Sequence, residues 1–318
     1  MSADLLAPQP KEGEPWDIVV IGSGPASLTA SIYTTRGAAS TLILGGEKWG
    51  GQLMLTTTVD NFPGFPEGVQ GPDLMLAMRK QAERFGALFL EKNVEKVDFT
   101  KKPFELTASG VIYKAKSVIV ATGADTLWLT CPGVNELIGR GVSSCAPCDA
   151  PFFKEKKVAV VGGGDSAMEE ALVLTKYASE VYIIHRRDAF RASQVMQQKV
   201  LSNPKIKVIW NTEVSKVKGI NKVENLILKN NKENTTSELP IDGLFIAIGH
   251  KPQTDIFKGV IDIDEKGFIL VKDHTKTNIE GVFVAGDVHD NHYKQAITAS
   301  GFGCMAAMDT LKYLDESK

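Results

Sequence analysis

The 318-residue sequence predicts an α/β protein made of two similar three-layer modules, with the second module inserted into the first. Residues 17–44 and 157–184 each read as a strand, a glycine-rich turn, a helix and a second strand. Residues 117–124 and 243–250 are apolar strands that end in glycine turns, roughly where a strand would return to each module's sheet. A further strand at 281–287 would close the first module.

These observations divide the chain into three segments. We expect residues 1–126 and 254–318 to form the first module and residues 127–253 to form the second. Residues 1–15 are polar and contain prolines, so we expect a loose tail there. The second module should also carry a β-meander built from strands near 207–210, 225–229 and 238–240.

The first glycine-rich turn has the residues that a dinucleotide needs. Gly22 allows the tight turn, Gly24 lets the backbone approach a pyrophosphate, and the small Ser27 permits close packing of helix on strand. Pro25 suits the first helical position and Gly37 can end the helix. The pattern predicts a nucleotide site of the Rossmann type.

The second glycine-rich turn, Gly162–Gly164, opens a helix expected over 165–177. About 20 residues beyond such a turn, a site for NAD presents an acidic residue to the ribose. Here the strand ends in His185-Arg186-Arg187, with Arg191 a turn later, which favours the 2′-phosphate of NADPH. The alternative is that these basic residues form a solvent-exposed edge that binds no phosphate. Two nucleotide units in one chain suggest a flavin and a nicotinamide.

Cys145 and Cys148 form a CxxC pair in a chain with only four cysteines. Such a pair is a redox couple, half of a zinc site, or a coincidence in a packed loop. No second CxxC exists, and the histidines show no ligand spacing beyond His289 and His292, so we expect no metal. Asp149 follows the pair directly, where it could cap a helix.

Composition excludes several classes of function. A net charge of −2 gives no electrostatic footprint for nucleic acid or an anionic membrane. No apolar run approaches the roughly 18 residues of a membrane span, and the first residues lack a signal-peptide core. We therefore expect a cytoplasmic protein, in which a CxxC pair is more often catalytic than structural.

Taken together, the motifs resemble low-molecular-weight (bacterial/fungal-type) NADPH-dependent thioredoxin reductases. The resemblance runs from about Asp17 to Leu314 and rests on motifs in a fixed order. They are Gly22-x-Gly24-Pro25-Ala26, Gly50-Gly51-Gln52-Leu53, Asn61-Phe62-Pro63-Gly64-Phe65, Cys145-x-x-Cys148-Asp149, Gly162-Gly163-Gly164-Asp165-Ser166-Ala167, His185-Arg186-Arg187 with Arg191, Gly286-Asp287-Val288, and Gln295-Ala296-Ile297-Thr298.

The resemblance implies a homodimer that passes electrons from NADPH through FAD and the Cys145–Cys148 disulfide to thioredoxin. It implies that Cys148 lies nearer the flavin, that Cys145 attacks thioredoxin, and that Asp149 is the acid/base. It also implies a second module that rotates between two arrangements.

The resemblance further implies two sets of binding residues. The FAD-binding residues would be Gly22, Ser23, Gly24, Pro25, Ala26, Gly51, Gln52, Leu53, Asn61, Val94, Thr122, Gly123, Gly286, Asp287, Lys294, Gln295 and Ala296. The NADPH-binding residues would be Gly163, Gly164, Asp165, Ser166, His185, Arg186, Arg187, Arg191, Ile248 and Gly249.

Some residues depart from the family pattern. Pro147 lies between the cysteines and removes an amide donor. Lys294 stands where the family has Arg. Trp49 interrupts the loop around Gly50–Leu53 that would contact the flavin, here called the flavin loop. Four alternatives stay open: a flavin dithiol oxidase, a reductase of another thioredoxin-like partner, a ferredoxin–NADP oxidoreductase and a flavin-binding sensor. The basic cluster argues against the oxidase, and the CxxC pair argues against the ferredoxin reductase.

Overall fold

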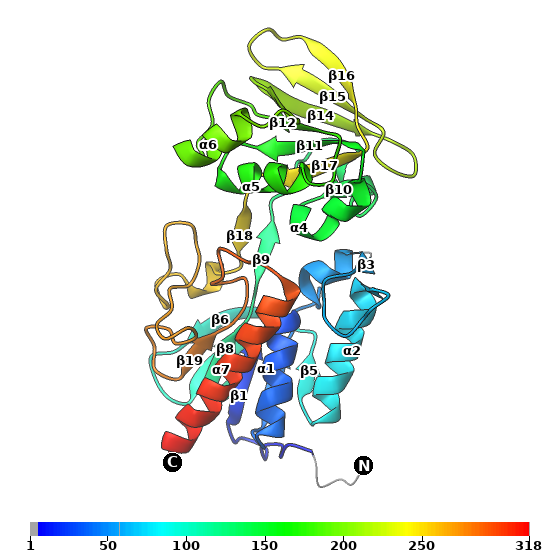
Figure 1. Ribbon diagram of the computed structural model, residues 1–318. Helices are drawn as coiled ribbons and strands as arrows, with labels where there is room; N and C mark the ends of the chain where they lie inside the picture. The colour runs from blue at the N-terminus through cyan, green and yellow to red at the C-terminus, as the bar shows by residue number, and fades with distance from the viewer. Residues whose placement is uncertain (1–5, 57, 318) are drawn as a thin grey trace. The chain divides into compact units, whose positions relative to one another are not determined.

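The computed structural model describes residues 6–56 and 58–317 (Figure 1). The chain divides into two compact units, one within 1–125 and 251–318 and the other within 126–250. Residues 251–253, expected in the insertion, fall in the first unit. The reason is a pair of hydrogen bonds, because the Gln253 amide donates to the carbonyl of Gly123 and the Gln253 carbonyl accepts from Thr122 Oγ1.

The first unit is built on a seven-stranded sheet. Its parallel part contains β5 (Leu88–Leu90), β2 (Thr41–Leu44), β1 (Trp16–Ile21), β8 (Val111–Val120) and β19 (Val282–Val284). The antiparallel strands β7 (Phe104–Ala108) and β6 (Val94–Asp98) continue it from β8. The short strands β3 (Thr58–Val59) and β4 (Val69–Gln70) form a separate pair.

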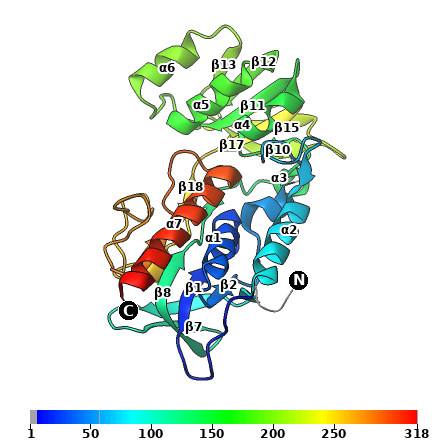
Figure 2. The ribbon, with the colours of Figure 1, turned by 60° about the horizontal axis from the view of Figure 1, so that its bottom comes forward.

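Helices α1 (Pro25–Arg36) and α7 (Ala296–Glu316) lie side by side on one face of this sheet (Figures 1 and 2). Their close approach needs a glycine, since a Cβ on Gly303 would lie 2.2 Å from the Ala26 carbonyl oxygen. Helix α2 (Gly71–Arg84) packs beside α1 around Leu28, Leu74 and Met75. On the opposite face, apolar side chains of the parallel strands form a core with those of β6 and β7 and with Phe257, Ile261 and Ile269.

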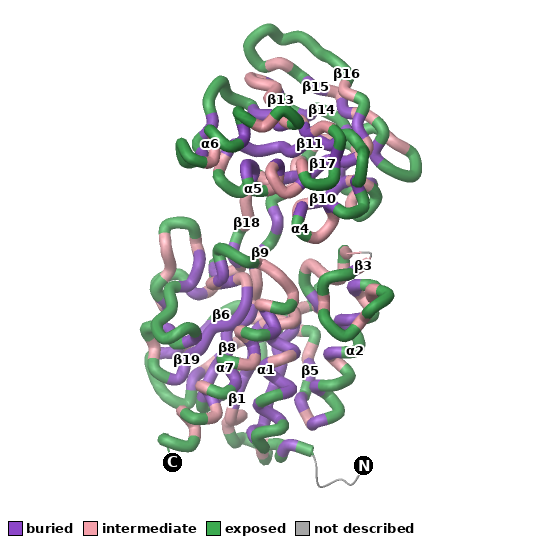
Figure 3. The backbone as a smooth tube through the Cα atoms, viewed as in Figure 1, coloured by how far each residue is buried: buried purple, intermediate pink, exposed green. Residues whose placement is uncertain are grey.

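The second unit is built on a five-stranded parallel sheet, with its strands in the order β10 (Val142–Ser143), β17 (Gly243–Ala247), β11 (Lys157–Gly162), β12 (Glu180–Ile184) and β13 (Ile206–Ile209). Helices α5 (Asp165–Leu174) and α6 (Gln194–Leu201) cover one face. An antiparallel sheet of β14 (Thr212–Lys218), β15 (Asn225–Asn230) and β16 (Thr236–Pro240) covers the other face. The parallel strands are mostly buried as a result (Figure 3).

The short elements lie in the connections. In the first unit they are the 3₁₀ turns η2 (Gly51–Leu55) and η4 (Asp255–Phe257). In the second they are α3 (Val134–Leu137), α4 (Ala146–Asp149) and the 3₁₀ turn η3 (Ala150–Phe153). Strands β9 (Ala124–Thr126) and β18 (His250–Pro252) pair where the chain passes between the units.

Two expectations about the second unit were wrong. The strand at 206–209 pairs in parallel with β12, so it extends the central sheet and is not part of the meander. The meander's first strand is β14, whose side chains alternate between buried and exposed on either side of a register shift between Val214 and Lys216. Helix α5 ends at Leu174, before Tyr177, because Lys176 and Tyr177 bond three residues back in a tighter turn.

The expected loose tail of residues 1–15 is docked on the first unit at residues 7–9. Ala7 is buried, and its amide donates to the carbonyl of Phe85 at 2.9 Å. Gln9 Nε2 donates to the carbonyl of Gly86 at 2.8 Å. These contacts dock residues 7–9 on the end of α2, whereas residues 1–5 lie outside the described part of the chain.

Candidate functional site

Most of the predicted FAD residues lie at one edge of the first sheet. Strands β1, β2, β8 and β19 are parallel, so their carboxyl ends meet at the same edge. Gly22–Ala26 follow β1, Gly51–Leu53 follow β2, Thr122 and Gly123 follow β8, and Gly286 and Asp287 follow β19. Ligands of open α/β sheets bind at this edge.

The glycine-rich turn after β1 leaves room where a pyrophosphate would lie. Gly22 has φ of +118°, and a Cβ there would lie 2.1 Å from the Ala121 carbonyl oxygen. A Cβ on Gly24 would meet nothing within 4 Å, so the start of α1 is open. Ser27, in the third glycine position, is buried and donates to the Gly22 carbonyl at 2.6 Å, which ties the turn to the helix.

Ser23 holds the predicted flavin loop to this turn. Its hydroxyl donates to the carbonyl of Gly45 at 2.6 Å and accepts from the amide of Gly50 at 2.9 Å. The loop then enters η2 with φ of +91° at Gly50 and +67° at Gly51. Gln52 and Leu53 are half-buried within η2.

Trp49 anchors the other side of the loop. Its ring packs edge-on against Phe89, with the centroids 5.8 Å apart. The guanidinium of Arg79 lies 4.7 Å from the Trp49 centroid and 3.9 Å from the Phe89 centroid. Arg79 also forms ion pairs with Glu83 at 2.9 Å and Glu91 at 2.8 Å. This cluster, which we call the Arg79 clamp, joins the flavin loop to α2 and β5.

Asp287 fits a polyol ligand. Its carboxylate is largely buried, and Oδ1 has no hydrogen-bond partner among the described residues. Burial and the nearby Asp290 carboxylate raise the pKa of Asp287 to about 6. A buried acceptor of this kind calls for a donor, and a ribityl hydroxyl would supply one. The open turn at Gly24 and this acceptor together fit FAD.

Asp290 shapes the segment before α7, and sequence reasoning missed it. Its Oδ1 accepts from the amides of His292 and Tyr293, and its Oδ2 accepts from the amide of Lys294 at 3.0 Å. These bonds hold Lys294 at φ of +50°, which is uncommon for a long side chain. An aspartate just before a turn is a known local signal and could have identified it.

The remaining predicted FAD residues are more dispersed. Asn61 Nδ2 donates to Gln295 Oε1 at 3.2 Å, and Gln295 is also the N-cap of α7, which begins at Ala296. Val94 starts β6 and packs against the core of the sheet.

The second sheet repeats the arrangement at its own carboxyl edge. Gly163–Ser166 follow β11, the basic cluster follows β12, and Ile248 and Gly249 follow β17. A Cβ on Gly164 would meet nothing within 4 Å. Asp165 Oδ1 accepts from the Ser193 amide and hydroxyl, at 2.9 and 2.8 Å. The Arg191 amide donates to the Gly163 carbonyl at 2.7 Å, so Arg191 starts beside the glycine turn.

The basic cluster is not uniform. Arg186, Arg187 and Arg191 are exposed, which leaves them open to a phosphate. His185 is buried, its Nε2 lies 3.1 Å from the Ala189 carbonyl, and its ring fills the space beside Gly163. Burial lowers the pKa of His185, which favours the neutral ring. The structure thus gives His185 a packing contact, while the charge of the cluster comes from the three arginines.

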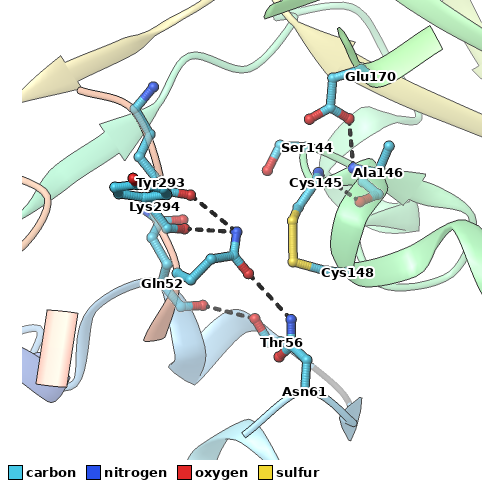
Figure 4. Close-up of a disulfide and its surroundings, with 12 residues drawn as sticks. Gln52, Thr56, Asn61, Ser144, Cys145, Ala146, Cys148, Glu170, Tyr293 and Lys294 are labelled. Atoms are coloured by element: carbon cyan, nitrogen blue, oxygen red, sulfur yellow. Dashed lines mark hydrogen bonds between the residues drawn. A yellow bond between two sulfur atoms is a disulfide. The ribbon is translucent and has the colours of Figure 1, made fainter. Parts of the chain in front are cut away.

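The cysteine pair lies at the same edge of the second sheet. Cys145 and Cys148 form a disulfide with a Cα–Cα distance of 5.3 Å, directly after β10 (Figure 4). Cys145 precedes α4, and Asp149 is the last residue of that helix. The Ala146 amide donates to Glu170 Oε2 of α5 at 2.5 Å (Figure 4). Glu170 is a second residue that sequence reasoning missed.

Comparison with known proteins agrees with this geometry. Residues 16–303 match the family described as pyridine nucleotide-disulphide oxidoreductase. A thioredoxin reductase of Streptomyces clavuligerus is 50% identical over 301 residues, which covers 94% of each chain. Thioredoxin reductase 2 of Arabidopsis thaliana is 50% identical over 316 residues, which covers 94% of this chain and 82% of the other.

Solved structures of thioredoxin reductases are also similar to this chain. The thioredoxin reductase from Giardia duodenalis has a TM-score of 0.92 and 41% identity, over 95% of this chain and 99% of the other. The one from Streptococcus pyogenes has a TM-score of 0.91 and 36% identity, over 95% and 98%.

The fold and the two sites define a pyridine nucleotide-disulphide oxidoreductase. Within that class, the chain belongs to the thioredoxin reductase family. The predicted fold class and family resemblance are therefore confirmed.

Proposed function

We propose that this protein reduces thioredoxin, taking electrons from NADPH through FAD and the Cys145–Cys148 disulfide. One observation carries the proposal. The disulfide, the open glycine turn and the exposed arginines follow β10, β11 and β12, so the disulfide and the residues proposed to bind NADPH share one edge of a single sheet. Membership of the thioredoxin reductase family supports the choice of thioredoxin as substrate.

The cofactor sites fit their ligands. FAD would be held by the turn at Gly22–Ala26, the loop at Gly51–Leu53 and the Asp287 carboxylate. The residues around Gln295 would also bind it. When bound, the flavin supplies two-electron transfer between the nicotinamide and the disulfide. NADPH would be held by the turn at Gly163–Ser166, with its 2′-phosphate on the exposed arginines.

The cysteines then perform thiol–disulfide exchange. In the reduced protein the Cys145 thiolate attacks one sulfur of the thioredoxin disulfide, forms a mixed disulfide and releases a thioredoxin thiolate. Cys148 attacks the Cys145 sulfur, releases the second thioredoxin thiolate and restores the Cys145–Cys148 disulfide. Asp149 protonates a departing thiolate or accepts the proton of the attacking thiol. Two thioredoxin thiols form for each disulfide restored.

Assembly and location belong to the same proposal. The family resemblance supports a homodimer. We also propose a cytoplasmic location, because in that reducing compartment a CxxC pair is more often catalytic than structural. Among residues 6–56 and 58–317, no helix is both long enough and apolar enough to span a membrane.

The runner-up is a flavin dithiol oxidase, or a reductase that serves another thioredoxin-like partner. An oxidase sends electrons to oxygen and needs no site for a 2′-phosphate. The exposed arginines beside an open glycine turn favour the reductase.

The test is an anaerobic NADPH titration of the FAD-loaded protein, followed by turnover with thioredoxin and a chromogenic disulfide. We expect NADPH to bleach the flavin and thioredoxin to sustain turnover, which Cys145→Ser abolishes. Bleaching without thioredoxin turnover would overturn the assignment of the partner. Failure of NADPH to bleach the flavin would overturn the assignment of the donor.

A further inference from the structure

The backbone amides of the CxxC turn donate to oxygen atoms. The Cys145 amide donates to Ser143 Oγ at 3.1 Å. The amides of Cys148 and Asp149 both donate to the Cys145 carbonyl, at 3.2 and 3.1 Å. Pro147 has no amide hydrogen. The Ala146 amide donates to Glu170 Oε2 at 2.5 Å, so each amide hydrogen of this turn has an oxygen acceptor.

This distribution affects the thiolate. Amide donors and positive charge at a helix N-terminus lower the pKa of a cysteine and stabilise its thiolate. A couple whose reduced form is stabilised in this way is a strong oxidant. Here Glu170 takes the first amide of α4 and brings a negative charge to the same turn, which disfavours a thiolate at Cys145. A reductase benefits, because its dithiol should give up electrons readily.

We propose that Glu170 is a positioning residue that binds the Ala146 amide and, through its charge, keeps the Cys145–Cys148 couple strongly reducing. The inference rests on the proposed function, since it concerns the couple that would reduce thioredoxin. Glu170 would act through the backbone of the turn, because its side chain accepts a hydrogen bond from the Ala146 amide (Figure 4).

The turn packs mainly against η3 and α5. Helix α4 itself contributes Asp149, and η3 contributes no charged residue. Helix α5 contributes Asp165, which accepts from Ser193, and Glu169, which is exposed beside Glu170. Glu169 is therefore a matched control, with the same charge at the adjacent position.

The first experiment measures thiol reactivity. In a Cys148→Ser background, the rate of Cys145 alkylation by iodoacetamide is followed against pH, with mass spectrometry of the Cys145 peptide as readout. Glu170→Gln keeps an oxygen acceptor for the Ala146 amide but removes the charge. We expect it to raise the rate at pH 7 about three- to tenfold and to move the midpoint to lower pH. Glu169→Gln should leave both unchanged.

The second experiment measures the redox equilibrium of the intact FAD-loaded protein. Dithiothreitol buffers of graded ratio, followed by acid quench and alkylation, give the fraction of Cys145–Cys148 that is reduced. We expect Glu170→Gln to shift the equilibrium constant toward the dithiol by up to about tenfold, which is about 30 mV for two electrons. Glu170→Ala, which also frees the amide, should shift it at least as far.

The outcomes are decisive either way. Shifts in both Glu170 variants with none in Glu169→Gln support the assignment. A Glu170→Gln variant that matches the unaltered protein, or that moves no more than Glu169→Gln, would overturn it. Flavin absorbance and circular dichroism confirm that each variant is folded. Neither measurement uses NADPH or thioredoxin, so a wrong partner in the proposed function would not be mistaken for a failure of this inference.

Discussion

Asn61 Nδ2 donates a hydrogen bond of 3.2 Å to Oε1 of Gln295, across 234 positions of the chain. The Gln295 side chain also accepts from the third residue of α7, and the Thr298 hydroxyl accepts from the Gln295 amide at 3.2 Å. The same carboxamide therefore caps α7 and binds the loop that follows β3. Asn61 and Gln295, which the sequence predicted separately as FAD-binding residues, are thus linked by a direct hydrogen bond.

The first prediction concerns this pair. Asn61→Ala and Gln295→Ala should each weaken FAD binding, because each removes one side of the link. A neutral hydrogen bond contributes about 0.5–1.5 kcal/mol, so we expect the double variant to lose less than the sum of the single losses by about that amount. FAD dissociation constants from reconstitution of the flavin-free protein measure the cycle. Strict additivity would show that the two side chains act independently.

The second prediction concerns the Arg79 clamp. Arg79→Ala removes two ring contacts worth about 0.5–1 kcal/mol each and two ion pairs worth about 0.2–1 kcal/mol each. We expect the free energy of unfolding to fall by about 1–4 kcal/mol. Because the flavin loop loses its anchor, the FAD dissociation constant should rise about tenfold.

Lys80 provides the control for this prediction, since it is the next residue on α2 and is exposed. Lys80→Ala should change neither denaturant unfolding nor the FAD titration. Equal effects of the two substitutions would mean that the clamp does not position the loop.

The third prediction concerns stability against pH in the flavin-free protein. Burial lowers the pKa of His289 to about 4, so its contribution to stability is full above 6.5 and is lost as the pH falls toward 4. Burial raises the pKa of Asp287 to about 6, so this carboxyl destabilises the fold at neutral pH and the penalty fades as the pH falls below 6. Each shift of about two units corresponds to about 3 kcal/mol.

The two effects oppose each other between pH 4 and 6, which makes the variants informative. Asp287→Asn should stabilise the flavin-free protein at pH 7 and expose the acid sensitivity caused by His289. His289→Leu, which keeps an apolar contact for Phe302, should remove that sensitivity. Thermal unfolding at graded pH measures both. Parallel pH profiles for the two variants would contradict the assignment.

The fourth prediction concerns the choice of nicotinamide. Arg186→Ala and Arg187→Ala should each raise the KM for NADPH by roughly tenfold or more, since a charge-assisted bond to phosphate contributes about 1.5–3 kcal/mol. The KM for NADH should change little, because NADH has no 2′-phosphate. Lys199→Ala, an exposed cation on α6, is the control. Equal losses with both nucleotides would refute recognition of the 2′-phosphate.

Local patterns predicted much of this fold. The strand, glycine turn and helix at 17–36 are coded within a few residues of each other, so α1 begins at Pro25 and ends at Arg36 as expected. Strand β13 was assigned to the wrong sheet because its sequence does not show which neighbour it pairs with. Strand pairing depends on the whole chain, whereas helix ends depend on local residues.

In the candidate site, too, local sequence predicts local structure but not the contacts between distant segments. Motifs identified the turns that could contact cofactors, since glycines and cysteines at fixed spacing carry their own signal. Glu170 and Arg79 carry no such signal, because each acts on a segment distant in sequence, Glu170 on the CxxC turn and Arg79 on the flavin loop. Positioning residues of this kind become visible only in three dimensions.

The fifth prediction concerns Pro147, which lies between the two cysteines of the CxxC turn. Pro147 is exposed and lies early in α4, where an ordinary residue would carry an amide hydrogen. Pro147→Ala restores that donor at the helix N-terminus, where it can stabilise a thiolate at Cys145. We expect the alkylation rate of Cys145 at pH 7 to rise about two- to fivefold in a Cys148→Ser background.

Pro151 supplies the matched control, because it is also exposed and also begins a short helical turn, η3, but lies outside the cysteine pair. Both substitutions should lower the free energy of unfolding by a similar amount, about 0.4–1 kcal/mol, since each loosens the unfolded chain equally. Only Pro147→Ala should change thiol reactivity. If Pro151→Ala has the same effect on Cys145, or if Pro147→Ala slows the alkylation, then the missing amide does not govern this thiol, and the reducing character of the couple must come from charge alone.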